Sequence, residues 1–152
     1  MILLMAVWEL GKPKLLFQML QSLYKVPTMR RYFLHETPIA KIILIHIRGT
    51  NGWKIHDDIA VASIESDMAG VIIDKPTFGA FDIADELAEG NYDEVDLVGL
   101  CTDICVIANA LILKTQFPEM KINIIENATA GTTPEAKQAA LTVAKSCQIN
   151  II

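Results

Sequence analysis

This chain of 152 residues has few cysteines and no clustered positive charge. Three cysteines do not make a disulfide framework, so a reducing, cytoplasmic setting fits better. The 13 basic residues form no Lys/Arg-rich run and the net charge is −5, which argues against a nucleic-acid partner. With 52% hydrophobic and 20% charged residues, the chain is expected to be globular, with one domain and a sizeable core.

A long uninterrupted hydrophobic run is also missing. The segment MILLMAVWELGKPKLLFQML starts apolar, but Glu9, Lys12 and Lys14 break it. It is too short for a membrane span and lacks the basic start of a signal peptide. We therefore expect neither a membrane partner nor secretion.

Glycine is absent between Gly11 and Gly49, although that stretch should contain turns. Its segment TMRRYFLHETP has no clean period, while 15–26 could form a helix and 40–47 a strand. The composition changes near His46. We therefore expect a single domain, 1–152, in which 1–45 is atypical and 46–152 is regular.

The regular part alternates short apolar runs with helical patterns. Because the runs are continuously apolar, they are expected to be strands buried on both faces of a parallel sheet. This alternation predicts the α/β class with right-handed crossovers. The expected strands are 69–74, 95–100, 122–127 and 148–152; the expected helices are 79–90, 102–117 and 132–146, the last capped by Thr132 or Thr133 and with Pro134 in its first turn.

Two cysteines lie in GLCTDICV, where the strand 95–100 gives way to a helix. A thiol at Cys105, in the first helical turn, faces unpaired N–H groups that favour the thiolate. Reactive groups in open α/β sheets also gather at the carboxyl ends of strands. The alternatives are a buried structural cysteine, or a metal or redox pair with Cys101, which would need further ligands or a different spacing. Cys147 is expected to lie in the core.

The motif GLCTDICV, with IDKPTFGAFD before it and ENATAGTTPEAKQAAL after it, resembles the isochorismatase-like cysteine hydrolases, and most closely their nicotinamidase/pyrazinamidase branch. The resemblance extends from about Arg48 to Ile152. It implies a three-layer α/β/α fold with a mostly parallel, Rossmann-like sheet. It also implies an Asp–Lys–Cys triad, in which Cys105 attacks an amide carbonyl and Lys75 lowers the pKa of its thiol.

The same resemblance places a cis peptide bond between Leu100 and Cys101, with the backbone N–H groups of Cys101 and Cys105 as the oxyanion hole. Asp103 either shapes this turn or is an ordinary acid at a helix start. Lys75 alone would be read as a solvated lysine at a strand end.

Three further residues are candidates with structural alternatives. Phe78 and Trp53 would form walls of the substrate pocket or be ordinary core aromatics. His46 would match the third ligand of a divalent, zinc-like metal or be structural. The other ligands, in a D-x-H motif, are absent from the sequence, and so is the D-x-Q-N-D-F pattern that carries the triad's aspartate.

The missing patterns suggest that the first strand is missing or replaced. We considered the reading frame in which each codon takes the last base of one codon and the first two bases of the next. In that frame, codons for MILLMAVWEL permit N-D-F-I-D-G-S-L-G-T, and codons for RYFLHETPIAKIIL permit I-F-L-T-R-D-T-H-S-K-N-Y-L-N, which contains the missing D-x-H motif. We therefore expect 1–45 to be an out-of-frame translation, with the true first strand encoded upstream. A genuine, diverged N-terminus is the alternative.

The function implied by the resemblance is hydrolysis of a small-molecule C–N amide bond through a cysteine thioester, with nicotinamide to nicotinate plus ammonia as the leading case. This exact chain is expected to be impaired, because the triad aspartate is absent. The alternatives are a non-catalytic decayed paralogue or fragment held by homo-oligomer contacts, and a hydrolase of ureido, carbamoyl or isochorismate-type compounds.

Overall fold

The computed structural model describes residues 5–7, 73, 77–89 and 92–152. The chain divides into two compact units, and all described residues belong to the one formed by Leu3–Pro13 and Ile72–Ile152. In chain order the described elements are β1 (Met5–Val7), α5 (Asp82–Glu89), β2 (Glu94–Leu100), the π-helical turn η2 (Thr102–Val106), α6 (Ile107–Gln116), β3 (Lys121–Ala130), α7 (Pro134–Ser146) and β4 (Asn150–Ile151).

The strands form one sheet in the order β1-β2-β3-β4. Strands β2, β3 and β4 are parallel, as the alternating pattern predicts, and β1 is antiparallel to β2. The predicted strand 95–100 is confirmed as β2 and 122–127 as the longer β3, whereas 148–152 shrinks to the two residues of β4. The predicted strand 40–47, and that at 69–74 except Ile73, lie outside the described residues.

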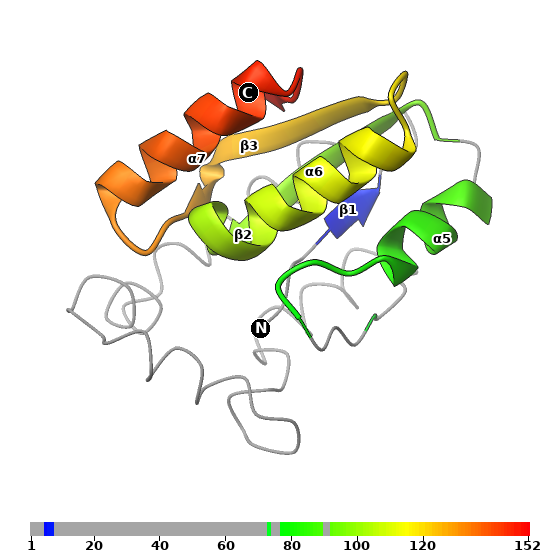
Figure 1. The fold of residues 1–152 in the computed structure, drawn as a ribbon, viewed down its shortest axis with the longest axis horizontal. Coiled ribbons are helices and arrows are strands. Elements are labelled where there is room, and N and C mark those ends of the chain that lie inside the picture. Colours follow the sequence, from blue (N-terminus) through cyan, green and yellow to red (C-terminus); the bar gives the residue numbers. More distant parts are fainter. Residues whose placement is uncertain (1–4, 8–72, 74–76, 90–91) are drawn as a thin grey trace, which may run out of the picture. The chain divides into compact units, whose positions relative to one another are not determined.

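One face of the sheet carries the hydrophobic core. Figure 1 shows α6 and α7 beside each other over β2 and β3, joined to them by tight turns. The three α-helices of the described residues bury their apolar positions in one cluster with residues of β2 and β3. The main members are Ile83, Leu87, Val95, Leu97, Val106, Leu113, Ile122, Ile124 and Leu141. The helical layer on this face therefore fixes the carboxyl ends of β2 and β3, where the candidate site lies.

The other face of the sheet carries a polar network around Asn123, which is nevertheless buried, in agreement with the prediction of strands buried on both faces. Asn123 is 2% exposed, and its Nδ2 donates to Glu94 Oε1 at 2.6 Å and to Asp96 Oδ1 at 2.7 Å. Its own Oδ1 accepts from Asn150 Nδ2 at 2.9 Å. A buried amide must be hydrogen-bonded, and this network meets that requirement with two side chains from β2 and one from β4.

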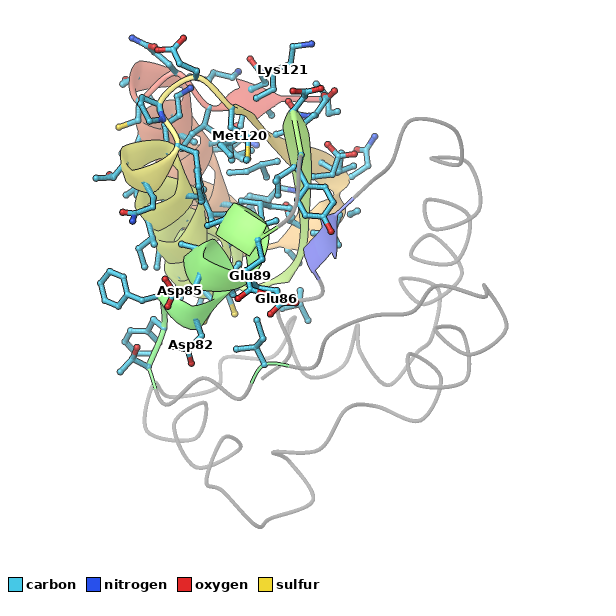
Figure 2. All side chains as sticks on the ribbon, turned by 90° about the vertical axis from the view of Figure 1, so that its right-hand side faces the viewer. Asp82, Asp85, Glu86, Glu89, Met120 and Lys121 are labelled. Atoms are coloured by element: carbon cyan, nitrogen blue, oxygen red, sulfur yellow. The ribbon has the colours of Figure 1, made fainter. Side chains whose placement is uncertain are left out.

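Helix α5 is amphipathic, as its pattern predicts, but it begins later than expected. Ile83, Ala84 and Leu87 are buried, whereas Phe81, within the predicted range 79–90, precedes the helix and is 74% exposed. The exposed face bears four acids, Asp82, Asp85, Glu86 and Glu89, which are labelled in Figure 2. The first two lie in the first turn, where they complement the helix dipole.

The helix predicted at 102–117 divides into two parts. Residues Thr102–Val106 form a π-helical turn, in which Val106 N–H donates to Cys101 O at 3.1 Å, and the α-helix follows from Ile107. Such turns insert one residue and re-aim the side chains that follow. Helix α7 begins as predicted, with Pro134 at its start and Thr133 Oγ1 accepting from Ala136 N–H at 3.1 Å.

Strand β1 pairs with the edge of β2, where the sequence suggests that the first strand of the family is missing or replaced. Its residues pair in the register Met5 with Leu97, Ala6 with Asp96 and Val7 with Val95. Within the described part of the chain, the β2 edge is thus paired with an antiparallel segment instead of being open. Among the same residues, no helix has the length and apolar character needed to cross a membrane.

Candidate active site

The candidate site is the turn that follows β2. The peptide bond between Leu100 and Cys101 is cis, at the position that the family resemblance predicts. Gly99 has φ 110°, a conformation that side chains disfavour, so glycine is required there. On the neighbouring strand β3, Ile124 pairs with Leu97 and Thr129 pairs with Gly99. Between these two pairs β3 has more residues than β2, so β3 bulges beside the turn.

Both cysteines of the turn are buried, each 1% exposed. Burial, followed by the nearby Asp103 and Cys105, raises the pKa of the Cys101 thiol to about 12. Cys101 therefore keeps its proton at neutral pH and is not a thiolate nucleophile. This leaves Cys105 as the candidate nucleophile of the turn, and leaves Cys101 a contribution through its backbone.

The raised pKa of Cys101 predicts a loss of stability in alkali. Between pH 9.0, the ordinary value, and about 12, the unfolded chain releases this proton while the folded chain retains it. The free energy of unfolding should therefore fall with rising pH by up to about 1.4 kcal/mol per pH unit more than in a Cys101→Ala variant. Urea unfolding of both proteins from pH 8 to pH 11 measures the difference, and two parallel curves would contradict it.

Asp103 joins the turn after β2 to the turn after β3. Its Oδ1 accepts from Thr132 N–H at 2.8 Å and its Oδ2 accepts from the Thr132 hydroxyl at 2.5 Å. Gly131 makes this approach possible, because a Cβ atom there would lie 2.9 Å from Asp103 Oδ1 and 2.7 Å from Lys137 Cβ. Of the two interpretations that the sequence leaves open, the structure supports Asp103 as a residue that shapes the turn.

Lys137 of α7 stabilises the bulge of β3 beside the candidate site. Its Nζ donates to Glu126 O at 2.7 Å and to Thr129 O at 2.9 Å. Burial lowers the pKa of Lys137, and the Glu126 carboxylate opposes that shift. The ammonium group thus binds the carbonyl of Glu126, within the irregular stretch of β3, and that of Thr129, where the pairing with β2 resumes.

Asn109 joins the segment Thr77–Phe81 to the π-helical turn. It is 1% exposed; its Oδ1 accepts from Ala80 N–H at 2.9 Å, and its Nδ2 donates to Cys105 O at 2.7 Å and to Phe78 O at 3.2 Å. Gly79 packs closely on the same helix, since a Cβ there would lie 2.5 Å from Ile112 Cδ1. The sequence analysis missed both Asn109 and Lys137. A polar residue within an apolar helix, four positions after Cys105, was the available signal for the first.

The remaining predicted site residues are placed as follows. Leu100 ends β2 and is partly buried, and Phe78 is 59% exposed, so Phe78 is not a core aromatic. Lys75, Trp53 and His46 lie outside the described residues, and their roles stay predictions. Cys147, predicted to be core, is partly buried and packs against the core cluster.

The predicted divalent metal finds no set of ligands in the described part of the chain. There, no three His, Cys, Asp or Glu side chains are placed to hold an ion. The D-x-H motif is absent from the sequence, and His46 lies outside the described residues. The described residues therefore do not fit a bound divalent ion.

A mostly parallel sheet with a cysteine-bearing turn at the carboxyl end of β2 defines an α/β protein with a candidate nucleophile at a strand end. The model of the isochorismatase domain matches residues 45–152. The chain therefore belongs to the isochorismatase family. No curated protein sequence gives a significant match.

Several solved structures are similar. The nicotinamidase/pyrazinamidase of Bacillus subtilis is 29% identical with a TM-score of 0.59, over 68% of this chain and 59% of that one. The pyrazinamidase/nicotinamidase of Streptococcus mutans is 29% identical with a TM-score of 0.60, over 69% of this chain and 60% of that one. A nicotinamidase of Staphylococcus aureus, 24% identical with a TM-score of 0.61 over 70% of this chain and 68% of that one, shows the shared fold. The chain thus spans about three fifths of the length of the Bacillus subtilis and Streptococcus mutans proteins.

Proposed function

We propose that the parent activity of this chain is hydrolysis of a small-molecule amide, with nicotinamide as the leading substrate. The observation that carries the proposal is Cys105, buried in a π-helical turn directly after a cis peptide bond at the end of a parallel strand. Two structures named as nicotinamidase/pyrazinamidase share this fold at 29% identity, which supports the choice of substrate.

In the proposed reaction, the Cys105 thiolate attacks the amide carbonyl, ammonia leaves after taking up a proton, and water hydrolyses the thioester to the acid. Lys75 favours the thiolate through its positive charge. The N–H groups of Cys101 and Cys105 stabilise the oxyanion. Phe78 and Trp53 line the pocket. These roles come from the motifs of the sequence, and the raised pKa of Cys101 is compatible with its backbone role.

The proposal includes an impairment of this exact chain. The sequence has no D-x-Q-N-D-F pattern, so the general base that would take the proton from Cys105 is not supplied by the usual motif. A non-catalytic family member is the second candidate, and the same absence favours it. The two candidates differ in whether Cys105 retains a reactive thiolate.

Alkylation distinguishes the two candidates. Iodoacetamide near pH 7 should label Cys105 well before Cys147, despite the burial of Cys105, if the environment of the thiolate survives. Peptide mass mapping over time measures both rates in one sample, so that Cys147 serves as an internal control. Equal, slow labelling of the two residues would exclude Cys105 as a nucleophile and leave the non-catalytic candidate.

A further inference from the structure

We propose that Asn109 is a positioning residue, which holds the segment Thr77–Phe81 in place against the turn that carries Cys105. This inference rests on the proposed function, because it assigns to Asn109 an effect on the reactivity of that cysteine. The family-like motifs around Cys105 and Phe78 do not include Asn109, and its contacts alone single it out.

The acceptor oxygen and the donor nitrogen of the Asn109 amide both form hydrogen bonds. An asparagine side chain has one acceptor oxygen and a nitrogen with two hydrogens. Here the oxygen takes the Ala80 N–H, and the nitrogen donates to the carbonyls of Phe78 and Cys105. No aliphatic side chain of similar size can replace these three bonds, and the N–H group of the buried Ala80 would lose its hydrogen-bond partner.

The three bonds join two parts of the chain that are distant in sequence. Ala80 and Phe78 lie 29 and 31 positions before Asn109, whereas Cys105 lies four positions before it, in the π-helical turn that leads into α6. The side chain thus sets the distance between the carbonyl of the candidate nucleophile and the backbone that carries Phe78.

The close packing of Gly79 supports the same view. A Cβ at Gly79 would lie 3.7 Å from Ala108 Cβ as well as 2.5 Å from Ile112 Cδ1, so the segment lies directly on the helix face next to Asn109. Glycine at position 79 lets the segment approach the helix closely. Apolar packing is not directional, so this contact does not by itself fix the position of the segment along the helix. Asn109 provides the directional part, which sets the register of the segment along the helix.

The test compares the whole chain with Asn109→Leu, and uses Thr115→Val as the matched control. Thr115 lies on α6 too, but its hydroxyl donates only to Leu111 O, within the same helix. In the leucine variant, hydrogen exchange of the Ala80 amide should accelerate at least about tenfold, since a buried hydrogen bond is lost. The control should leave that rate unchanged.

The second measurement follows Cys105 alkylation by iodoacetamide between pH 6 and pH 9. The leucine variant should shift the pH midpoint or lower the plateau rate at least about threefold, while Cys147 labels as before. Faster exchange at Ala80 with an unchanged Cys105 profile would reduce Asn109 to a structural role and overturn the inference. Unchanged exchange would overturn it directly.

Slow Cys105 labelling in the unmodified chain would be a different result. It would contradict the proposed function and, with it, any positioning role, even if Ala80 exchange rose. If the leucine variant does not fold, Asn109→Ser replaces it. The serine hydroxyl is too short to join all three partners, so it should give the same direction of change in both measurements, and wild-type values in either would overturn the inference.

Discussion

Nicotinamide hydrolysis should increase by roughly 10³- to 10⁵-fold when residues 1–45 are replaced by the matching N-terminal segment of the Bacillus subtilis nicotinamidase. The junction follows the family match, which begins at residue 45. The expected gain reflects the general base that the motif of the family supplies and that this sequence lacks. Ammonia release from nicotinamide, measured on this chain and on the chimera at equal concentration, gives the ratio.

The control is the same chimera with Cys105→Ala, which should lose the gain, because the nucleophile is gone while the new segment remains. A folded chimera that leaves nicotinamide intact but hydrolyses a ureido or carbamoyl compound would redirect the proposal to that substrate class. If the unmodified chain already matched the chimera, the general base would have to lie within this chain, and the expected impairment would be wrong.

Removing the carboxylate of Asp103 should have the largest effect on stability among the residues of the candidate site. Asp103→Ala deletes two hydrogen bonds to Thr132, at 2.8 and 2.5 Å, which join the turns after β2 and β3. Hydrogen bonds to a charged group contribute more than neutral ones, so we expect the free energy of unfolding to fall by about 2–4 kcal/mol. Urea denaturation at pH 7 measures this change.

Two variants make the Asp103 result specific. Asp103→Asn keeps an acceptor for the Thr132 N–H and should cost less than about half as much. Thr132→Val removes only the hydroxyl and should fall between wild type and the alanine variant. An alanine variant within about 0.5 kcal/mol of wild type, the range of an ordinary surface substitution, would show that this pair does not hold the turns together.

Much of the fold follows from local patterns that act over short distances. The apolar runs of β2 and β3 and the Thr133–Pro134 start of α7 are each encoded within a few neighbouring residues, and the structure confirms them. The π-helical turn at Thr102–Val106 was not predicted, because its side chains are equally compatible with an ordinary helical turn. The polar network around Asn123 was missed because it forms only when three strands align.

In the candidate site, too, some features follow from neighbouring residues and others form only when the chain folds. Cys101, Cys105 and Asp103 share one short motif, so the sequence brings them together without any knowledge of the sheet. Asn109 and Lys137 form hydrogen bonds with backbone groups of other segments, which come close only when the chain folds. Every residue has these backbone groups, so no sequence motif identifies which of them will be the partner. The interpretation of 1–45 as a shifted reading frame stays a prediction, which the nucleotide sequence from before the Met1 codon to the Thr50 codon decides.

The antiparallel pairing of Met5–Val7 with Val95–Leu97 has a consequence for how this chain could arise. An edge strand joins a sheet through amide and carbonyl groups that every residue except proline carries. Many different sequences can therefore form the strand next to β2, whereas a catalytic position requires one particular residue. A chain whose first codons were rewritten can thus keep a strand paired with β2 while it loses the catalytic residue that those codons once specified.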